Sequence, residues 1–272
     1  MLQAAGFVLF GFVVGVYGTL VGAGGGFLVV PFLLLVKHFD AAQAAGTSLV
    51  VVFLNALSGT IAYARQKRID YKSGLWFAGA ALPGSLLGAY GVNFLSQRSF
   101  HIAVGALLSM VAGILLVRPH GALAGAQARA ARQTGGLLPV ERRLVDAEGR
   151  VFEYRYDRFV GLVLSFFVGF LSSLLGIGGG IIHVPALVLL LAFPAHISTA
   201  TSHFILAITA AMGAASHAAL GHVQFGPALA MGAGAVVGAP LGAKLSQRTG
   251  GAWILRGLAI ALLVVGIRLF FH

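Results

Sequence analysis

Long apolar runs, separated by short polar stretches, make up almost the whole chain. Most of them reach the roughly 20 residues that an α-helix needs to cross a bilayer. The eight runs cover residues 4–36, 41–64, 74–95, 99–117, 159–193, 197–220, 226–245 and 252–271. The pattern predicts an all-α polytopic membrane protein with about eight transmembrane helices. The short alternating strands of an outer-membrane barrel do not occur in it.

The first run of each half of the chain contains a cluster of glycines followed by a proline. The clusters are Gly-Ala-Gly-Gly-Gly at 22–26, with Pro31, and Gly-Ile-Gly-Gly-Gly at 176–180, with Pro185. Glycine in a helix interior costs about 1 kcal/mol relative to alanine, so we expect both helices to break there. A crossing helix that breaks at the glycines and continues as a half-helix or a re-entrant piece fits the length of each run best. Two full helices per run, giving ten crossings and inverted halves, are the alternative.

The glycine clusters belong to an internal duplication that covers nearly every run. A shift of 154 residues superposes the clusters and pairs Thr47 and Ser48 with Thr201 and Ser202. With a gap of four residues, two further glycine pairs correspond, Gly84/Gly88 and Gly234/Gly238. Their small-xxx-small spacing indicates close helix packing. Broken helices at matching positions of two halves are typical of a transport site between the halves.

The duplication divides the chain into three parts: a first membrane repeat (1–118), a linker (119–158) and a second membrane repeat (159–272). An alanine-rich segment of the linker, residues 121–132, has the composition of a short interfacial helix. Later in the linker, Glu-Gly stands between two β-prone runs, which predicts a small hairpin over residues 144–154. We assign no chemistry to this linker.

The net charge of +11 does not by itself indicate a nucleic-acid partner. The basic residues lie in loops beside the apolar runs, where positive charge sets the orientation in the membrane. They crowd residues 65–72 and the linker. With four crossings per half, we expect a multi-pass protein of the inner membrane, surrounded by lipid, with both termini and the linker in the cytoplasm. The sequence leaves open whether copies of the chain form a homo-oligomer.

The acidic residues carry information through their positions. All seven lie in loops or at the ends of the runs: Asp40, Asp70, Glu141, Asp146, Glu148, Glu153 and Asp157. Cation and proton pumps use carboxylates within the membrane, so this placement argues against them and against an aspartyl-type membrane protease. The chain also has no cysteine, no Gly-x-Ser-Gly and no His-Glu-x-x-His. We therefore expect no enzyme activity, no metal and no cofactor.

The apolar runs instead offer hydrogen-bond donors, which suit an anion. Within the runs of the second half, histidines occur at 183, 203 and 217, where the first half has Val29, Leu49 and Tyr63. We expect both halves to contribute equivalent substrate-binding groups. They are Gly22, Gly24, Gly25, Gly26, Thr47, Ser48, Asn55, Gly176, Gly178, Gly179, Gly180, Thr201, Ser202 and His203. Close helix packing is the alternative role for the glycines, and helix capping is the alternative for the hydroxyls.

A Gly-x-Gly-Gly-Gly cluster followed by proline, present in both halves of an eight-run chain, resembles the TauE/SafE family of sulfite and organosulfur anion exporters. The resemblance covers the whole chain apart from the linker. It implies a permease of the bacterial inner membrane that moves sulfite, sulfonates or related sulfur-containing anions. A cell interior negative by 100 mV favours the exit of an anion by about 2.3 kcal/mol per charge. A passive anion channel, a non-transporting assembly subunit and, least of all, a membrane enzyme are the alternatives.

Overall fold

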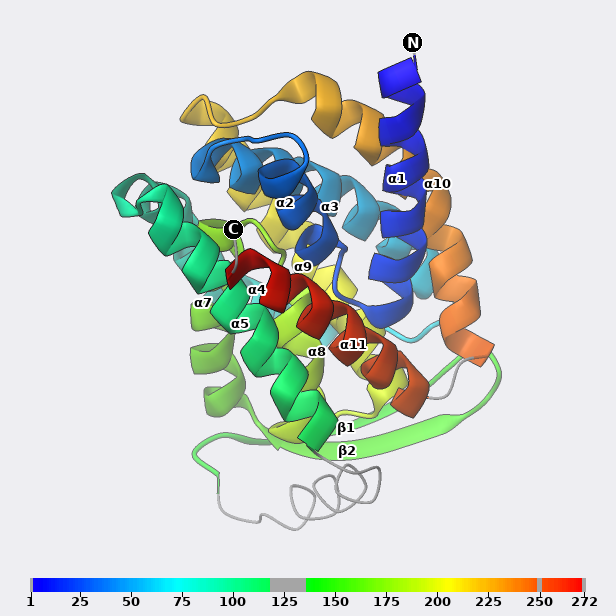
Figure 1. Cartoon of the computed structure of the whole chain (residues 1–272). Coiled ribbons are helices and arrows are strands. Elements are labelled where there is room, and N and C mark those ends of the chain that lie inside the picture. Colours follow the sequence, from blue (N-terminus) through cyan, green and yellow to red (C-terminus); the bar gives the residue numbers. More distant parts are fainter. Residues whose placement is uncertain (1, 118–135, 249–250, 271–272) are drawn as a thin grey trace.

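The computed structural model describes residues 2–117, 136–248 and 251–270, and Figure 1 shows how its elements are arranged. The helices of the first half are α1 (Leu2–Val21), α2 (Gly26–Leu35), α3 (Ala41–Arg65), α4 (Tyr71–Gly91), a short 3-10 helix (Val92–Phe94) and α5 (Gln97–Val117). Those of the second half are α7 (Arg158–Leu175), α8 (Gly180–Leu189), α9 (Ala195–Ala219), α10 (Phe225–Arg248) and α11 (Gly251–Phe270).

Among the described residues, six helices are long and apolar enough to cross a membrane. They are α1, α3, α4 with its 3-10 extension, α7, α9 and α10. This confirms a mainly helical, polytopic membrane protein. The helices α2 and α8 have only ten residues each, about half of the length that a crossing needs. The helices α5 and α11 are not among the six.

Both first runs break at their glycine clusters. Gly22, Gly24 and Gly25 have φ angles of 80°, 76° and 83°, and Gly176 and Gly178 have 68° and 73°. Side chains with a Cβ rarely adopt this left-handed conformation, so glycine is required at these positions. The expected break is therefore present in both halves.

After its break, the chain turns back instead of continuing across. The ring of Phe32 in α2 stacks on Phe10 of α1, with 4.2 Å between ring centroids. Phe27, at the start of α2, lies near Tyr17, toward the end of α1. In the second half, His183 of α8 approaches Ser165 of α7 in the same way. Each first run is therefore a long helix followed by a half-helix that returns alongside it.

Close glycine contacts join the two halves. In Figure 1, α1 and α10 lie side by side. A Cβ on Gly238 of α10 would lie only 2.9 Å from the backbone nitrogen of Val16 in α1. A Cβ on Gly84 of α4 would lie 2.9 Å from the backbone nitrogen of Phe170 in α7. The small-xxx-small glycines thus allow α1 to pack on α10 and α4 on α7, as the sequence predicts.

Matching helices of the two halves point in opposite directions. Along the contact of α1 with α10 the residue numbers rise together, from Gly11 against Met231 to Gly15 against Ala235, so these helices are parallel. Similar contacts make α4 parallel to both α7 and α9, and α3 parallel to α10. In contrast α3 and α9 cross antiparallel, because Gly59 packs on His203 while Gly213 packs on Leu49.

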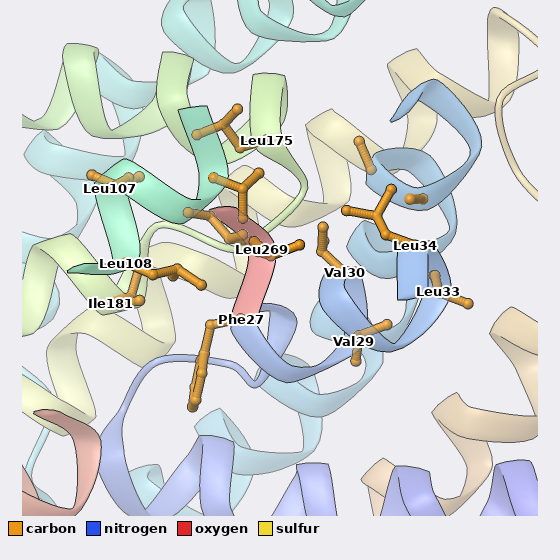
Figure 2. Packing of buried hydrophobic residues seen from close by; sticks show 14 of the residues in the cluster. Phe27, Val29, Val30, Leu33, Leu34, Leu107, Leu108, Leu175, Ile181 and Leu269 are labelled. Carbon is orange, nitrogen blue, oxygen red and sulfur yellow. The ribbon is translucent and has the colours of Figure 1, made fainter. Parts of the chain in front are cut away.

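The apolar core surrounds the half-helices. Figure 2 shows Phe27, Val30 and Leu33 of α2 among buried side chains of neighbouring helices. These neighbours include Leu107 and Leu108 of α5, Leu175 of α7, Ile181 of α8 and Leu269 of α11. Packing of this kind fixes short helices that would not be stable alone.

The linker forms a two-stranded antiparallel sheet of β1 (Pro139–Val145) and β2 (Val151–Asp157). The predicted hairpin is confirmed and is longer than residues 144–154, so the all-α expectation is corrected by one small sheet. The alanine-rich segment 121–132 lies outside the described residues.

The hairpin and the N-terminus lie at opposite ends of the helical body (Figure 1). The amide of Ala147 in the hairpin turn donates to the carbonyl of Gln66, just after α3. Lys37, shortly before α3, lies over the ring of Phe7 near the start of α1. The structure thus places the hairpin and the N-terminus at opposite ends of the helical body, whereas the sequence predicts both on one side of a membrane. The physical reason is that α2 returns to the end at which α1 begins, so that α3 then runs from that end to the end where the hairpin lies.

Candidate functional site

The two glycine breaks meet inside the protein. A Cβ on Gly26, at the start of α2, would lie 2.5 Å from the carbonyl oxygen of Ile177 in the other break. A Cβ on Gly180, at the start of α8, would lie 2.7 Å from the Cα of Ala23. Only glycine permits this mutual approach of two backbones.

The meeting point lies at mid-depth. Positions for a Cβ on Gly24 and on Gly178 both lie 3.1 Å from Val52, and both lie beside Leu206. Val52 and Leu206 are near the middle of α3 and α9, which have 25 residues each. The breaks are thus placed halfway along the two longest helices, where α3 crosses α9.

Two helix N-termini without side-chain caps converge at this point. The N-cap residues of α2 and α8 are Gly25 and Gly179, and neither helix has a side-chain cap, whereas aspartates cap α3, α4 and α7. The first N–H groups of a helix have no partner within the helix. The N-terminus also carries a partial positive charge of roughly 0.5. The arrangement therefore creates positive potential between the halves without a charged side chain.

Charged side chains are kept away from this centre. Among the described residues, the buried Asp, Glu, Lys and Arg side chains are Arg68, Asp70 and Asp146, and all three lie at the hairpin end. In the same part of the chain, no three His, Cys, Asp or Glu side chains are grouped to hold a metal ion.

Hydrogen bonds organise the break between α1 and α2 around Thr19. The Thr19 hydroxyl donates to Oδ1 of Asn55 over 3.0 Å, and it lies 3.2 Å from Nε2 of His203. The Thr19 carbonyl accepts from the Tyr63 hydroxyl over 2.7 Å. All four side chains are completely buried. The expected residues Asn55 and His203 are therefore together at the break.

The expected glycines take part through their carbonyls. Nδ2 of Asn55 donates to the Gly24 carbonyl over 3.0 Å, and the Ser202 hydroxyl donates to the Gly22 carbonyl over 3.1 Å. Backbone carbonyls of the first break thus accept the hydrogen bonds of Asn55 and Ser202.

Thr19 and Tyr63 were missed from the sequence. Thr19 stands three residues before the first glycine of its cluster, and Ser173 stands at the corresponding place in the second half. A hydroxyl residue at the same distance from both breaks is the signal that identifies Thr19. Tyr63 and its counterpart His217 make matching contacts, because Nε2 of His217 lies 2.9 Å from the Ser173 carbonyl.

Thr47 and Thr201 bind backbone amides of loops. The Thr47 hydroxyl accepts from the backbone N–H of Gln224 over 3.0 Å, and the Thr201 hydroxyl accepts from the backbone N–H of Asp70 over 3.1 Å. Each threonine thus fastens a loop to a helix. Substrate contact at these two positions stays a prediction.

A second polar cluster joins the hairpin to α4. The Asp70 carboxylate caps α4 through the backbone N–H of Ser73 and accepts from Nε of Arg142 over 3.0 Å and from the Tyr154 hydroxyl over 2.8 Å. Burial alone would raise the pKa of Asp70, but these hydrogen bonds outweigh it and hold the pKa below its usual value. The linker, to which we assigned no chemistry, is therefore held by a buried ion pair.

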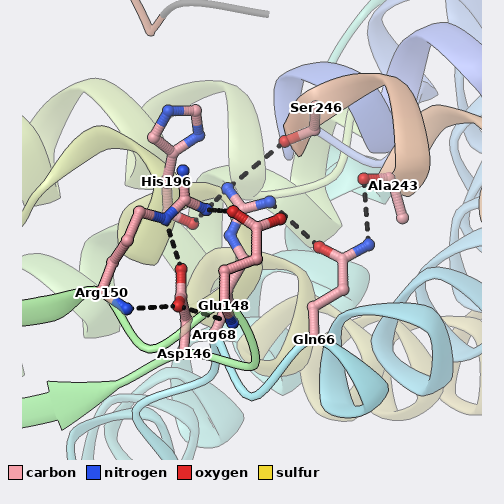
Figure 3. Close-up of polar contacts among 8 residues, drawn as sticks. All are labelled: Gln66, Arg68, Asp146, Glu148, Arg150, His196, Ala243 and Ser246. Atoms are coloured by element: carbon pink, nitrogen blue, oxygen red, sulfur yellow. Dashed lines mark hydrogen bonds and ion pairs between the residues drawn. The ribbon is translucent and has the colours of Figure 1, made fainter. Parts of the chain in front are cut away.

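Arg68 is the centre of a third cluster, shown in Figure 3. Its guanidinium donates to Oε1 of Gln66 and to the His196 carbonyl, both over 3.0 Å, and the side chain is completely buried. Gln66 in turn donates to the Ala243 carbonyl over 3.1 Å. In the sequence, Arg68 is one of the basic residues at 65–72 that we expect to set the orientation in the membrane. The structure adds that it connects the end of α3 with α9 and α10.

Half-helices that meet between two halves, inside a bundle with six candidate membrane spans among the described residues, define the chain as a polytopic membrane transporter. The chain belongs to the TauE/SafE sulfite exporter family, whose model, "Sulfite exporter TauE/SafE", matches residues 7–269.

Curated relatives agree with this membership. The chain is 35% identical to the probable membrane transporter protein YunE of Bacillus subtilis (strain 168), over 97% of this chain and 96% of YunE. It is 28% identical to a probable membrane transporter protein of Methanocaldococcus jannaschii, over 89% of this chain and 85% of the relative. YjnA of Bacillus subtilis (strain 168), also a probable membrane transporter protein, is 27% identical over 96% and 98% of the two chains. No solved structure matches the chain.

Proposed function

We propose that the protein is a secondary transporter that carries a small anion through the space where the two glycine breaks meet. The observation that carries this proposal is the convergence, at mid-depth, of two helix N-termini without side-chain caps. Such termini bind anions in soluble proteins and in transporters with broken helices. The family name and the absence of a buried carboxylate near the described breaks favour sulfite, a sulfonate or a related oxyanion as the substrate.

The transport cycle would use the two halves as inverted repeats, residues 1–118 and 159–272, joined by the linker 119–158. Opposite helix directions and matching contacts support this relation. Rocking of one repeat against the other would then expose the breaks to one side at a time.

Basic residues favour the inner membrane with the hairpin in the cytoplasm. Arg65, Lys67 and Lys72 lie at the hairpin end, together with the arginines of β1 and β2. Lys37, between α2 and α3, and Arg98, in the first turn of α5, lie at the opposite end. This orientation would place the N-terminus outside.

Transport in proteoliposomes tests the proposal. We expect saturable uptake of radiolabelled sulfite, accelerated by unlabelled sulfite on the other side, because a carrier exchanges its substrate. The Gly179→Leu variant should abolish uptake, since Gly179 is buried and a Cβ there already lies 2.8 Å from Val168.

Gly79→Leu is the matched control, because nothing lies within 4 Å of a Cβ at that exposed position of α4. Equal uptake by Gly179→Leu and the control would contradict a site at the breaks. Linear, non-saturable flux without counterflow would indicate the passive anion channel instead.

A further inference from the structure

We infer that the anion binds on the α8 side of the meeting point, held by the hydroxyls of Ser48 and Ser173 together with the N-terminal amides of α8. This inference rests on the proposed function and identifies the side chains of its site. It departs from the symmetrical site that the duplication alone predicts.

Unpaired hydroxyls distinguish the two breaks. At the first break, the hydroxyls of Thr19 and Ser202 are both hydrogen-bonded, to Asn55 and to the Gly22 carbonyl. At the second break, their counterparts Ser173 and Ser48 are completely buried, and their hydroxyl oxygens have no hydrogen-bond partner. A buried polar group without a partner is unfavourable, so its persistence calls for a ligand that satisfies it.

The second break also lacks the side chains that satisfy the first break. The position of His203 is occupied by Leu49 in the other half, and the position of Asn55 is occupied by Thr209. The Thr209 hydroxyl bonds the carbonyl of Ile205 in its own helix, so it does not reach Ser173. The hydroxyls of the duplicated scaffold are therefore satisfied by protein hydrogen bonds at the first break and open for a ligand's hydrogen bonds at the second.

Both serines flank Gly176, where α7 ends. Gly176 packs on the backbone of Ala45, and Ser48 follows Ala45 by three residues, on the same face of α3. Ser173 precedes Gly176 by three residues in α7. From Gly176 the chain leads through three residues to the uncapped start of α8 at Gly180. Hydroxyl and amide donors thus surround one short stretch of backbone.

Gly213 of α9 packs closely beside Ser173. A Cβ on Gly213 would lie 3.0 Å from the Ser173 hydroxyl, 3.1 Å from Cδ1 of Leu49 and 3.2 Å from the Ser85 hydroxyl. The corresponding glycine of the first half, Gly59, faces the imidazole of His203. At the second break, the aliphatic side chain of Leu49 therefore stands where a hydrogen-bonding ring stands at the first, and it offers the Ser173 hydroxyl no partner.

The charge of the site indicates the class of anion. The two half-helix N-termini together supply a positive charge of about one unit. The buried charged side chains of the described chain all lie at the hairpin end and add nothing here. The site therefore matches a singly charged oxyanion with several acceptor oxygens, such as hydrogensulfite or a small sulfonate, better than a dianion such as sulfate.

Calorimetric titration of the purified full chain with methanesulfonate, which is singly charged at all relevant pH values, tests this assignment. Ser48→Ala and Ser173→Ala should each raise the Kd by about 10- to 100-fold, the effect of losing one hydrogen bond to a charged group. Ser173→Thr should retain binding, because Thr19 shows that the scaffold accommodates threonine at the corresponding position. Sulfate should bind at least tenfold more weakly than methanesulfonate.

Ser109→Ala is the matched control, since the Ser109 hydroxyl of α5 is also buried without a partner but lies against Gly266 of α11, away from both breaks. Its Kd should equal that of the unaltered protein. Without anion, Ser48→Ala and Ser173→Ala should keep the melting temperature, because no protein hydrogen bond is removed. A lower melting temperature with an unchanged Kd would overturn the inference and assign both serines to folding.

The outcomes separate this inference from the proposed function. If the unaltered protein binds and transports anions while both alanine variants keep its Kd, the inference fails and the transporter stands. If the unaltered protein neither binds nor transports sulfite or methanesulfonate, the proposed function itself fails.

Discussion

Gly25 and Gly179 occupy corresponding positions at the two breaks, yet their backbones differ. Gly25 has a φ of 83°, in the left-handed region, whereas Gly179 has a φ of −64°, which any residue adopts. A Cβ on Gly25 would also meet the side chain of Val14, its closest neighbour in α1. The two breaks are therefore alike in sequence but unequal in the demand for glycine.

Alanine substitution should reveal this difference. Gly25→Ala forces a left-handed alanine, which costs about 1–2 kcal/mol, in addition to the contact with Val14. Gly179→Ala avoids the left-handed cost and only needs Val168 to move slightly. We expect a larger loss in the free energy of unfolding for Gly25→Ala, measured by denaturation in detergent micelles. Equal losses for the two variants would contradict the backbone assignment.

At the scale of elements, the hairpin is the part that the duplication does not explain. Its tyrosines Tyr154 and Tyr156 pack on Phe193 between α8 and α9, with ring centroids 4.5 and 5.0 Å away. Its arginine Arg142 reaches Asp70 at the start of α4. The hairpin thus connects the first half with the second at one end of the molecule and forms a strap that the proposed rocking motion would have to carry or release.

Arg142→Ala should loosen this strap. It leaves the Asp70 carboxylate, which is only 3% exposed, without its cationic partner, and losing one member of a buried pair costs about 3 kcal/mol. Chymotrypsin should then cleave after Tyr154 and Tyr156 about 100-fold faster, because cleavage follows the population of the undocked hairpin.

Arg143→Ala provides the control for this experiment. Arg143 pairs only loosely with Glu153, over 3.4 Å, and both side chains are about 70% exposed. Such surface pairs contribute little, so the cleavage rate should stay near that of the unaltered protein. Equally rapid cleavage of both variants would show that general loosening of the hairpin, and not the Asp70 contact, controls docking.

At the scale of the whole molecule, the opposite directions of matching helices fix which ends share a side. Three long helices, α1, α3 and α10, point one way, and α4, α7 and α9 point the other way. The start of α1 therefore faces away from the hairpin, whatever the orientation of the protein in its membrane.

Cysteine labelling can test this arrangement directly, because the chain has no cysteine of its own. Gln3 near the N-terminus and Ala147 in the hairpin turn are both exposed and accept single cysteines. In intact cells, an impermeant maleimide should label Gln3→Cys, and Ala147→Cys should react only after the membrane is opened. Labelling of both sites from one side would contradict the inverted arrangement, and the reverse pattern would contradict only the cytoplasmic placement of the hairpin.

The sequence by itself determined the helical membrane class, the two breaks and the hairpin, because each depends on local composition: apolar length, clustered glycines and a Glu-Gly turn between β-prone runs. It also identified Asn55, Ser202 and His203 near the breaks, through polar residues in apolar runs. Only the tertiary structure decided that α2 turns back and that the halves point in opposite directions. It alone paired Thr19 with His203 and Asp70 with Arg142, residues 184 and 72 positions apart. An apolar pattern records that a side chain leaves water, whereas its partner depends on how distant helices pack.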